Sequence, residues 1–158
     1  MAEMTNPHDG LISFQQALQG GLISPKICTL HKDLSIFHDD AEGTPRLTYA
    51  FIEDGVVKVT VVYVKVEPID GAPCFGIGYA VAEPFRKQGL AKKVIEKTID
   101  EIKIGFKNHI PKFYIEAIVG ESNIPSQKIA ASLISSSPTA ITDRVSGLPA
   151  FQYVRLIN

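Results

Sequence analysis

Residues 79–93, YAVAEPFRKQGLAKK, join the end of an apolar strand to the start of an amphipathic helix. From Leu90 to Ile102, apolar side chains recur every three to four residues, the spacing of one helix face. The first turn of a helix leaves backbone N–H groups unpaired, and the helix dipole adds positive potential there. Gly89 lets a ligand approach the backbone without meeting a Cβ atom. The loop 86–91 therefore predicts an anion site that suits a phosphate or diphosphate.

The distribution of charged side chains also places net positive charge in the half of the sequence that contains this loop. Residues 86–158 hold 11 basic and 6 acidic side chains, whereas residues 1–85 hold 5 basic and 11 acidic ones. We expect the first set to face an anion and the second a cation. The net charge of −1 makes the chain as a whole a poor general polyanion binder. Binding of nucleic acid through the basic stretch 86–97 is the weaker alternative.

Two common phosphate-binding motifs do not fit this loop. Gly89 is followed by Leu-Ala-Lys-Lys rather than Gly-Lys-Ser/Thr, so the loop is not a P-loop. The G-x-G-x-x-G fingerprint is absent, and the strand before the loop reads as antiparallel. The remaining alternative from the residues alone is a solvated basic face on an amphipathic helix.

Upstream of the loop, the sequence predicts a short helix and a run of antiparallel strands. Apolar spacing predicts a helix over 11–19, which Gly20-Gly21 ends. Residues 38–45 read as a polar loop after a weakly indicated strand within 26–37. The remaining predictions are strands over 46–53, 56–66 and 74–81, a tight hairpin at Asp54-Gly55, and a turn over 67–73.

Downstream, the pattern predicts a helix over 90–104 and a strand over 113–119. Asn123 and Pro125 open a second helix, and two closing strands cover 139–144 and 150–157. The fold class is therefore mixed α/β (α+β). We expect a single domain over residues 1–158, with a central, largely antiparallel sheet flanked by helices.

Composition narrows the class of protein. With 45% hydrophobic and 21% charged residues, the 158-residue chain resembles an ordinary folded domain. No apolar run is long enough to span a membrane, and the first ten residues lack the apolar core of a secretory signal. Cys28 and Cys74 lack metal-ligand spacing, so we expect free thiols, a cytoplasmic location and no metal site. The sequence leaves a homodimer open.

The R-x-x-G-x-A pattern of Arg86, Gly89 and Ala91 resembles the Q/R-x-x-G-x-G/A loop of the GNAT superfamily of N-acetyltransferases. Val81, Pro84, Phe85 and Arg86 resemble the approach to that loop. Asn123-Ile-Pro-Ser126 resembles the N-x-x-S helix start of ribosomal-protein alanine acetyltransferases and related members. The resemblance is strongest over residues 46–135.

The resemblance implies a role for each segment. Backbone N–H groups of residues 87–91 would hold the diphosphate of acetyl-CoA, and the strand edge 79–81 would pair with its pantetheine arm. Lys92 and Lys93 would face the 3′-phosphate, while Asn123 and Ser126 would lie near the thioester. The expected acetyl-CoA contacts are Tyr79, Ala80, Val81, Arg86, Lys87, Gln88, Gly89, Leu90, Ala91, Lys92, Asn123 and Ser126.

The acids and bases familiar in the family are missing. The positions that match its tyrosine acid and its two kinds of acidic residue hold Ala130, Phe75 and Ile118. Ser126 is therefore the candidate acid, and Glu116, on the same strand face as Ile118, is the candidate base. The alternatives are that Ser126 only caps its helix and that Glu116 is an exposed or salt-bridged strand residue. Further candidates, acting through water, are Glu67 and Asp70.

The resemblance implies an acyltransferase that moves an acetyl group from acetyl-CoA to a primary amine by direct attack in a ternary complex. The acceptor is either a small molecule or a protein amine. The alternative is a non-catalytic acyl-CoA-binding regulatory domain, which the missing acid and base favour. Release of CoA in the presence of amines distinguishes the two.

Overall fold

A mixed sheet of eight strands forms the centre of the computed structural model, which describes residues 6–41 and 43–158. The strand order is β1-β2-β3-β4-β5-β6-β8-β7, and every neighbouring pair is antiparallel except β5 and β6. The predicted fold class is confirmed. The strands are β1 (Lys26–Ile27), β2 (Leu34–Ala41), β3 (Thr44–Glu53), β4 (Val56–Ile69), β5 (Ala72–Val81), β6 (Phe113–Gly120), β7 (Thr139–Thr142) and β8 (Pro149–Ile157).

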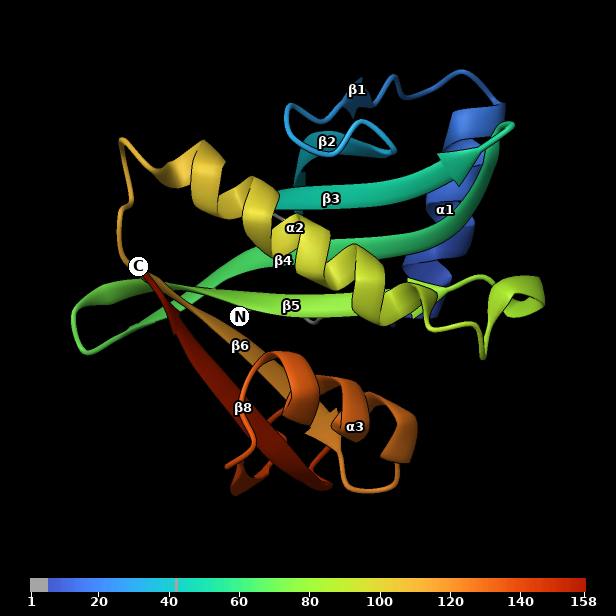
Figure 1. Ribbon diagram of the computed structural model, residues 1–158. Coiled ribbons are helices and arrows are strands. Elements are labelled where there is room, and N and C mark those ends of the chain that lie inside the picture. The colour runs from blue at the N-terminus through green and yellow to red at the C-terminus, as the bar shows by residue number, and fades with distance from the viewer. Residues whose placement is uncertain (1–5, 42) are drawn as a thin grey trace.

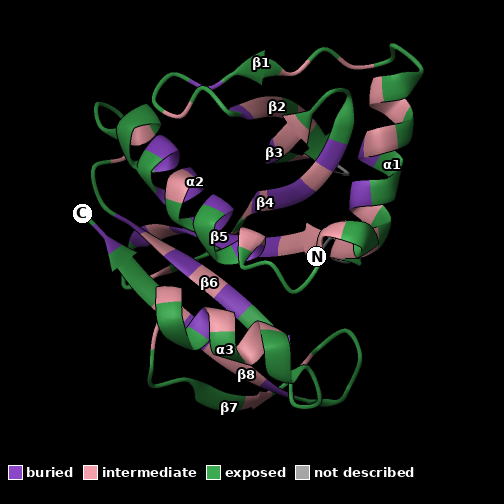
Figure 2. Cartoon of the chain, turned by 45° about the vertical axis from the view of Figure 1, so that its right-hand side comes forward, coloured by how far each residue is buried: buried purple, intermediate pink, exposed green. Residues whose placement is uncertain are grey.

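Helices cover both faces of the sheet (Figure 1). Helices α2 (Leu90–Phe106) and α3 (Ile124–Leu133) pack on one face, and α1 (Pro7–Gln19) packs on the other. The buried residues of these helices lie on the side that faces the strands, and the exposed residues lie on the side away from them (Figure 2). A 3₁₀ helix, η1 (Glu83–Phe85), lies between β5 and α2. The helices predicted over 11–19 and 90–104, and the one opened by Asn123, are all present.

The main core lies between α2 and the sheet. Alternating side chains of β4 (Val59, Val61 and Tyr63) meet Val94 and Ile95 of α2, and all five are at most 4% exposed. Each such apolar side chain contributes roughly 1.5–3 kcal/mol of burial free energy. The Tyr63 hydroxyl lies 2.9 Å from Thr98 Oγ1, which satisfies the buried polar atoms. The core therefore fixes α2, and with it the loop that precedes α2, against β4 and β5.

The predicted polar loop over 38–45 is wrong, because these residues belong to a hairpin. β2 and β3 pair continuously from Leu34 opposite Phe51 to Ala41 opposite Thr44. Asp39 and Arg46 face each other in this register and form an ion pair. The cross-strand partner provides the pairing that the polar composition alone does not reveal.

Other boundaries differ by a few residues. Helix α1 begins at Pro7 rather than residue 11, because the Asn6 side chain accepts a hydrogen bond from the N–H of His8 and caps the helix. The turn predicted over 67–73 is limited to Asp70-Gly71, where both residues have positive φ. Asp54-Gly55 also has positive φ at both positions and forms the predicted hairpin.

A buried carboxylate ties α2 to the segment before β2. Glu101 is 7% exposed. Its oxygens accept hydrogen bonds from the N–H of Leu30 at 2.9 and 3.2 Å and from the N–H of His31 at 3.1 Å. Charge-assisted bonds to backbone N–H groups are stronger than neutral ones, and they leave no buried charge unpaired. Glu101 therefore anchors the chain where it enters the sheet.

Replacing Glu101 with alanine is expected to lower the free energy of unfolding by about 2 kcal/mol, because partly buried N–H groups lose their acceptor. Urea denaturation of the purified variant measures this loss. Glu96→Ala is the matched control, since Glu96 is exposed on the same helix. Equal losses in the two variants would contradict the anchoring role of Glu101.

Candidate functional site

The sheet opens between β5 and β6. These parallel strands pair only where Cys74–Gly76 meet Tyr114–Glu116. Beyond this point β6 continues with β8 as far as Gly120, whereas β5 continues with β4 as far as Val81. The two strands therefore separate toward their carboxyl ends, and the unpaired stretch between them is called the opening below. This opening lies directly upstream of the loop 86–91.

The backbone of β5 offers hydrogen-bonding groups to this opening. The N–H of Ala82 donates to the carbonyl oxygen of Lys58 on β4 at 2.8 Å. Successive residues of a strand turn their backbone groups to opposite sides, so those of Tyr79 and Val81 point away from β4 and into the opening. The backbone of Ala80 points to β4, opposite Thr60. Among the described residues, no strand pairs with Tyr79 or Val81 on the open side.

The loop after β5 concentrates N–H groups at the start of α2. Lys87 and Gly89 have φ values of +63° and +73°, and Gly89 is the N-cap of the helix. The first intrahelical bond runs from the N–H of Lys93 to the carbonyl of Gly89, so the N–H groups of residues 90–92 have no partner within the helix. A Cβ atom at Gly89 would meet nothing within 4 Å. The loop is thus an open cradle of N–H groups that can bind an anion.

The basic side chains around the cradle have different roles. Lys92 and Lys93 are exposed in the first turn of α2 and add positive potential. Arg86 instead holds the loop in place: its Nε donates to the Val81 carbonyl at 3.1 Å, and its Nη2 lies 3.1 Å from His8 Nδ1 on α1. Arg86 therefore joins the loop to β5 and to α1.

Asn123, not Ser126, caps α3. The Asn123 Oδ1 accepts a hydrogen bond from the N–H of Ser126 at 3.3 Å. The alternative in which Ser126 only caps the helix is therefore wrong. The carbonyl oxygen of Ser126 accepts a hydrogen bond from the Tyr79 hydroxyl at 3.0 Å. This bond brings the first turn of α3 to the open edge of β5.

Glu116 stands where the opening begins, opposite Gly76 on β5. Its neighbours Ile115 and Ala117 are buried in the core beneath α2 and α3, so Glu116 lies on the other face of the sheet. It is half-buried, and its Oε2 accepts a hydrogen bond from Gln152 Nε2 at 2.7 Å. Glu116 is thus half-buried and forms no salt bridge with any residue that the structure describes, which corrects the alternative expectation. Ser126 and Glu116 flank the opening from opposite faces.

The structure excludes Glu67 and Asp70 from this site. Both lie at the hairpin end of β4 and β5, on the far side of the segment where β5 and β6 pair. Asp70 and Tyr79 are nine positions apart along β5 and its turn, a span of roughly 30 Å in an extended chain. The prediction that these two carboxylates serve the site through water is wrong.

Three contacts of the site were not predicted from the sequence. They are Tyr79 with Ser126, Gln152 with Glu116, and His8 with Arg86. Each joins segments 36 to 78 residues apart. None of the three follows from a local motif. Once β6 and β8 are paired, Ile118 lies opposite Gln152, which places Gln152 on the same face of the sheet as Glu116.

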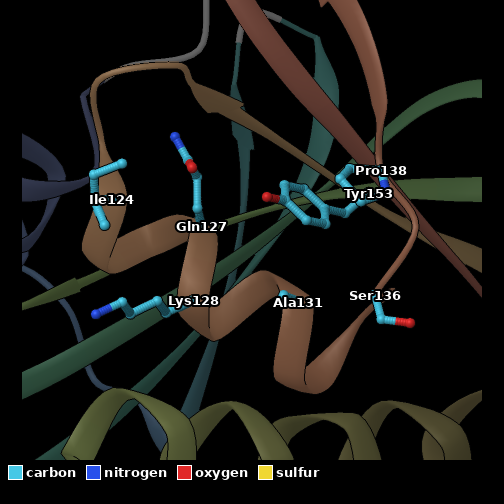
Figure 3. A pocket seen from close by; sticks show the side chains of 7 residues that line it. All are labelled: Ile124, Gln127, Lys128, Ala131, Ser136, Pro138 and Tyr153. Atoms are coloured by element: carbon cyan, nitrogen blue, oxygen red, sulfur yellow. The ribbon is translucent and has the colours of Figure 1, made fainter.

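Weaker candidates for a functional centre are the two cysteines, metal-ligating side chains and a surface cavity beside α3. Cys28 and Cys74 are free and buried, and burial raises the pKa of each thiol to about 12, so neither is a ready nucleophile. Within the two described ranges, no cluster of three metal-ligating side chains occurs and no helix could cross a membrane. A cavity of about 410 Å³ flanks α3, and Tyr153 points from β8 toward Gln127 there (Figure 3).

Comparison with known proteins supports a common fold. The structure is similar to the ribosomal-protein-S5-alanine acetyltransferase of Vibrio fischeri, with a TM-score of 0.54, 14% identity and coverage of 73% of this chain and 62% of the other. RimJ of Mycobacterium smegmatis, in complex with CoA-disulfide, gives a TM-score of 0.55 and 18% identity over 73% and 54% of the two chains. This chain thus spans less than two thirds of either relative.

A GNAT-family acetyltransferase from Streptococcus pneumoniae is similar over nearly the whole length. It gives a TM-score of 0.55 and 11% identity, with coverage of 99% of this chain and 98% of the other. No curated protein matches the sequence significantly. The family model described as Acetyltransferase (GNAT) family matches residues 22–133. This match covers more than half of the sequence and includes β5, the loop 86–91 and α3, so the chain belongs to the acetyltransferase (GNAT) family.

Proposed function

We propose that this protein is an N-acetyltransferase that moves an acetyl group from acetyl-CoA to a primary amine. One observation carries the proposal: the open edge of β5 leads directly into the N–H cradle at the start of α2. An edge strand can pair with an amide-containing chain, and a helix N-terminus can bind a diphosphate. In CoA the pantetheine arm is followed by the diphosphate, just as the open edge of β5 is followed by the N–H cradle along this chain.

The donor site would use backbone groups for most of its contacts. The N–H groups of residues 87–91 would bind the diphosphate. The backbone of Tyr79 and the N–H of Val81, whose carbonyl already accepts from Arg86, would pair with pantetheine amides. Lys92 and Lys93 would lie near the remaining phosphate. Acetyl-CoA supplies a thioester whose carbonyl carbon is open to a nucleophile.

The reaction needs three events at the opening. The bound ammonium first gives up a proton, the resulting neutral amine attacks the carbonyl carbon, and the C–S bond then breaks while the nitrogen loses a second proton and the sulfur gains one. Glu116 would take the first proton from the ammonium, directly or through water, on one face of the sheet. Ser126 would supply a proton to the sulfur from the other face. A free thiol has a pKa of about 8.5, so even a weak donor can complete this step.

The acceptor side favours a cationic amine. Glu116 is half-buried and keeps one carboxylate oxygen bonded to Gln152, which holds its charge at the opening. A lysine-like ammonium or a protein N-terminus carries the complementary charge at neutral pH. Two of the similar structures carry names that describe enzymes modifying ribosomal proteins, one at alanine and one at an α-amino group. A protein N-terminal amine is therefore one class to test beside small amines.

The first experiment is calorimetric titration of the purified protein with acetyl-CoA, followed by a thiol assay of CoA release with a panel of amines. The panel contains a polyamine, lysine and alanine-initiated peptides. Micromolar binding with amine-dependent release of CoA is the expected result. Binding without release under any amine would favour a regulatory acyl-CoA-binding domain, and absence of binding would contradict the proposal altogether.

A further inference from the structure

The hydroxyl of Tyr79 joins the two walls of the opening. Tyr79 belongs to β5, three residues beyond Gly76, where β5 and β6 last pair. Its hydroxyl donates to the carbonyl oxygen of Ser126 in the first turn of α3 at 3.0 Å. The residues are 47 apart in sequence, and no strand pairing connects their elements. The bond therefore spans the gap that the sheet itself leaves open.

The surroundings of this bond favour its persistence. The Tyr79 ring packs against the main core between α2 and the sheet. Burial of the side chain raises the pKa of Tyr79, so its hydroxyl keeps its proton and remains a donor through the neutral range. The acceptor is a carbonyl in the first turn of a helix whose cap, Asn123, is already fixed by its bond to Ser126. Both ends of the bond are thus held by rigid parts of the fold.

We propose that Tyr79 is a positioning residue of the donor site, whose hydroxyl sets the spacing between the β5 edge and the first turn of α3. This inference rests on the proposed function, because it assigns the spaced groups to the pantetheine arm. The backbone of Tyr79 points into the opening from β5, and the first turn of α3, a helix that packs over β6 and β8, lies on the other side. A pantetheine arm that binds between β5 and α3 contacts two surfaces whose separation is already fixed. The protein then loses less conformational freedom on binding.

Tyr79→Phe removes only the hydroxyl and keeps the ring in the core. Titration of this variant with CoA is expected to show binding about fivefold to tenfold weaker than in the wild-type protein, the range of one lost hydrogen bond. With acetyl-CoA as substrate, KM should rise more than kcat falls. Adenosine 3′,5′-bisphosphate lacks the pantetheine arm, and its affinity should stay within twofold of the wild-type value.

Tyr114→Phe is the matched control, since Tyr114 lies on β6 and points to the opposite sheet face from the buried Ile115. It should bind CoA as the wild-type protein does. Equal or tighter CoA binding by Tyr79→Phe would overturn the positioning role. Equal weakening for CoA and the bisphosphate would also overturn it, because damage would then extend to the loop. Absence of CoA binding by the wild-type protein would instead contradict the proposed function.

Discussion

Replacing Gly89 with glutamate is expected to weaken the binding of acetyl-CoA by about 100-fold or more. Gly89 is the N-cap of α2, where three successive N–H groups lack helical partners. A carboxylate at this position would compete for those groups and repel the diphosphate. Two unit charges about 5 Å apart interact by roughly 1–3 kcal/mol near a protein surface, and 1.4 kcal/mol corresponds to a factor of ten. Repulsion by a doubly charged diphosphate therefore reaches the expected size.

The charge effect can be separated from strain and bulk. Gly89 has a φ of +73°, which costs any other residue about 1–2 kcal/mol. The space around its Cβ position is open, so the side chain itself causes no clash in the free protein. Gly89→Gln has the same strain and nearly the same volume as Gly89→Glu but no charge. We expect the glutamine variant to bind measurably better than the glutamate variant in calorimetric titrations.

Two results would contradict this account. Wild-type affinity in Gly89→Glu would mean that the diphosphate lies elsewhere. Equal losses in the glutamate and glutamine variants would mean that bulk, rather than charge, determines the effect. Urea denaturation of both variants provides the folding control, and their free energies of unfolding should agree closely because the same backbone strain is present in each.

The segment from β5 to α3 could be predicted because its signals are local. The positive φ of Gly89 at the start of α2 and the Asn123 cap of α3 each follow from residue types within one turn. Family resemblance over the same segment is confirmed by the matching family model. That residues 1–158 form a single domain, and that the assigned residues contact acetyl-CoA, remain predictions.

The parts that were missed depend on distant partners. The end of the β2–β3 hairpin, residues 38–45, is polar, and its pairing is revealed only by cross-strand partners such as Asp39 and Arg46. The point where β5 leaves β6 depends on the pairing of two strands that are far apart in the sequence, and the residues of either strand alone do not define it. The bond between Tyr79 and Ser126 forms only because β5 and α3 meet there. Such contacts require the tertiary structure.

Replacing Glu116 with glutamine is expected to lower kcat/KM for the amine about 100-fold at pH 7, with acetyl-CoA affinity unchanged. General base catalysis typically contributes 10²–10⁴-fold. The substitution keeps the shape of the side chain and removes its charge and basicity. Its position on the face opposite α3 leaves the loop and the cradle untouched. The matched control is Glu121→Gln, because Glu121 is exposed just beyond the end of β6.

The pH dependence distinguishes a base from a residue that only attracts the amine. An alkyl ammonium has a pKa near 10, so without a base only the fraction of amine that is already neutral can react. Below pH 10 this neutral fraction rises tenfold with each pH unit. For a base, the deficit of Glu116→Gln should therefore shrink steadily between pH 7 and pH 10. If Glu116 only attracts the cation, it strengthens binding of the ammonium form. Its replacement by glutamine then raises KM for the amine and leaves kcat unchanged. A deficit in kcat that stays constant across this range would contradict proton transfer to Glu116, because removing a base must matter least where the amine is already neutral.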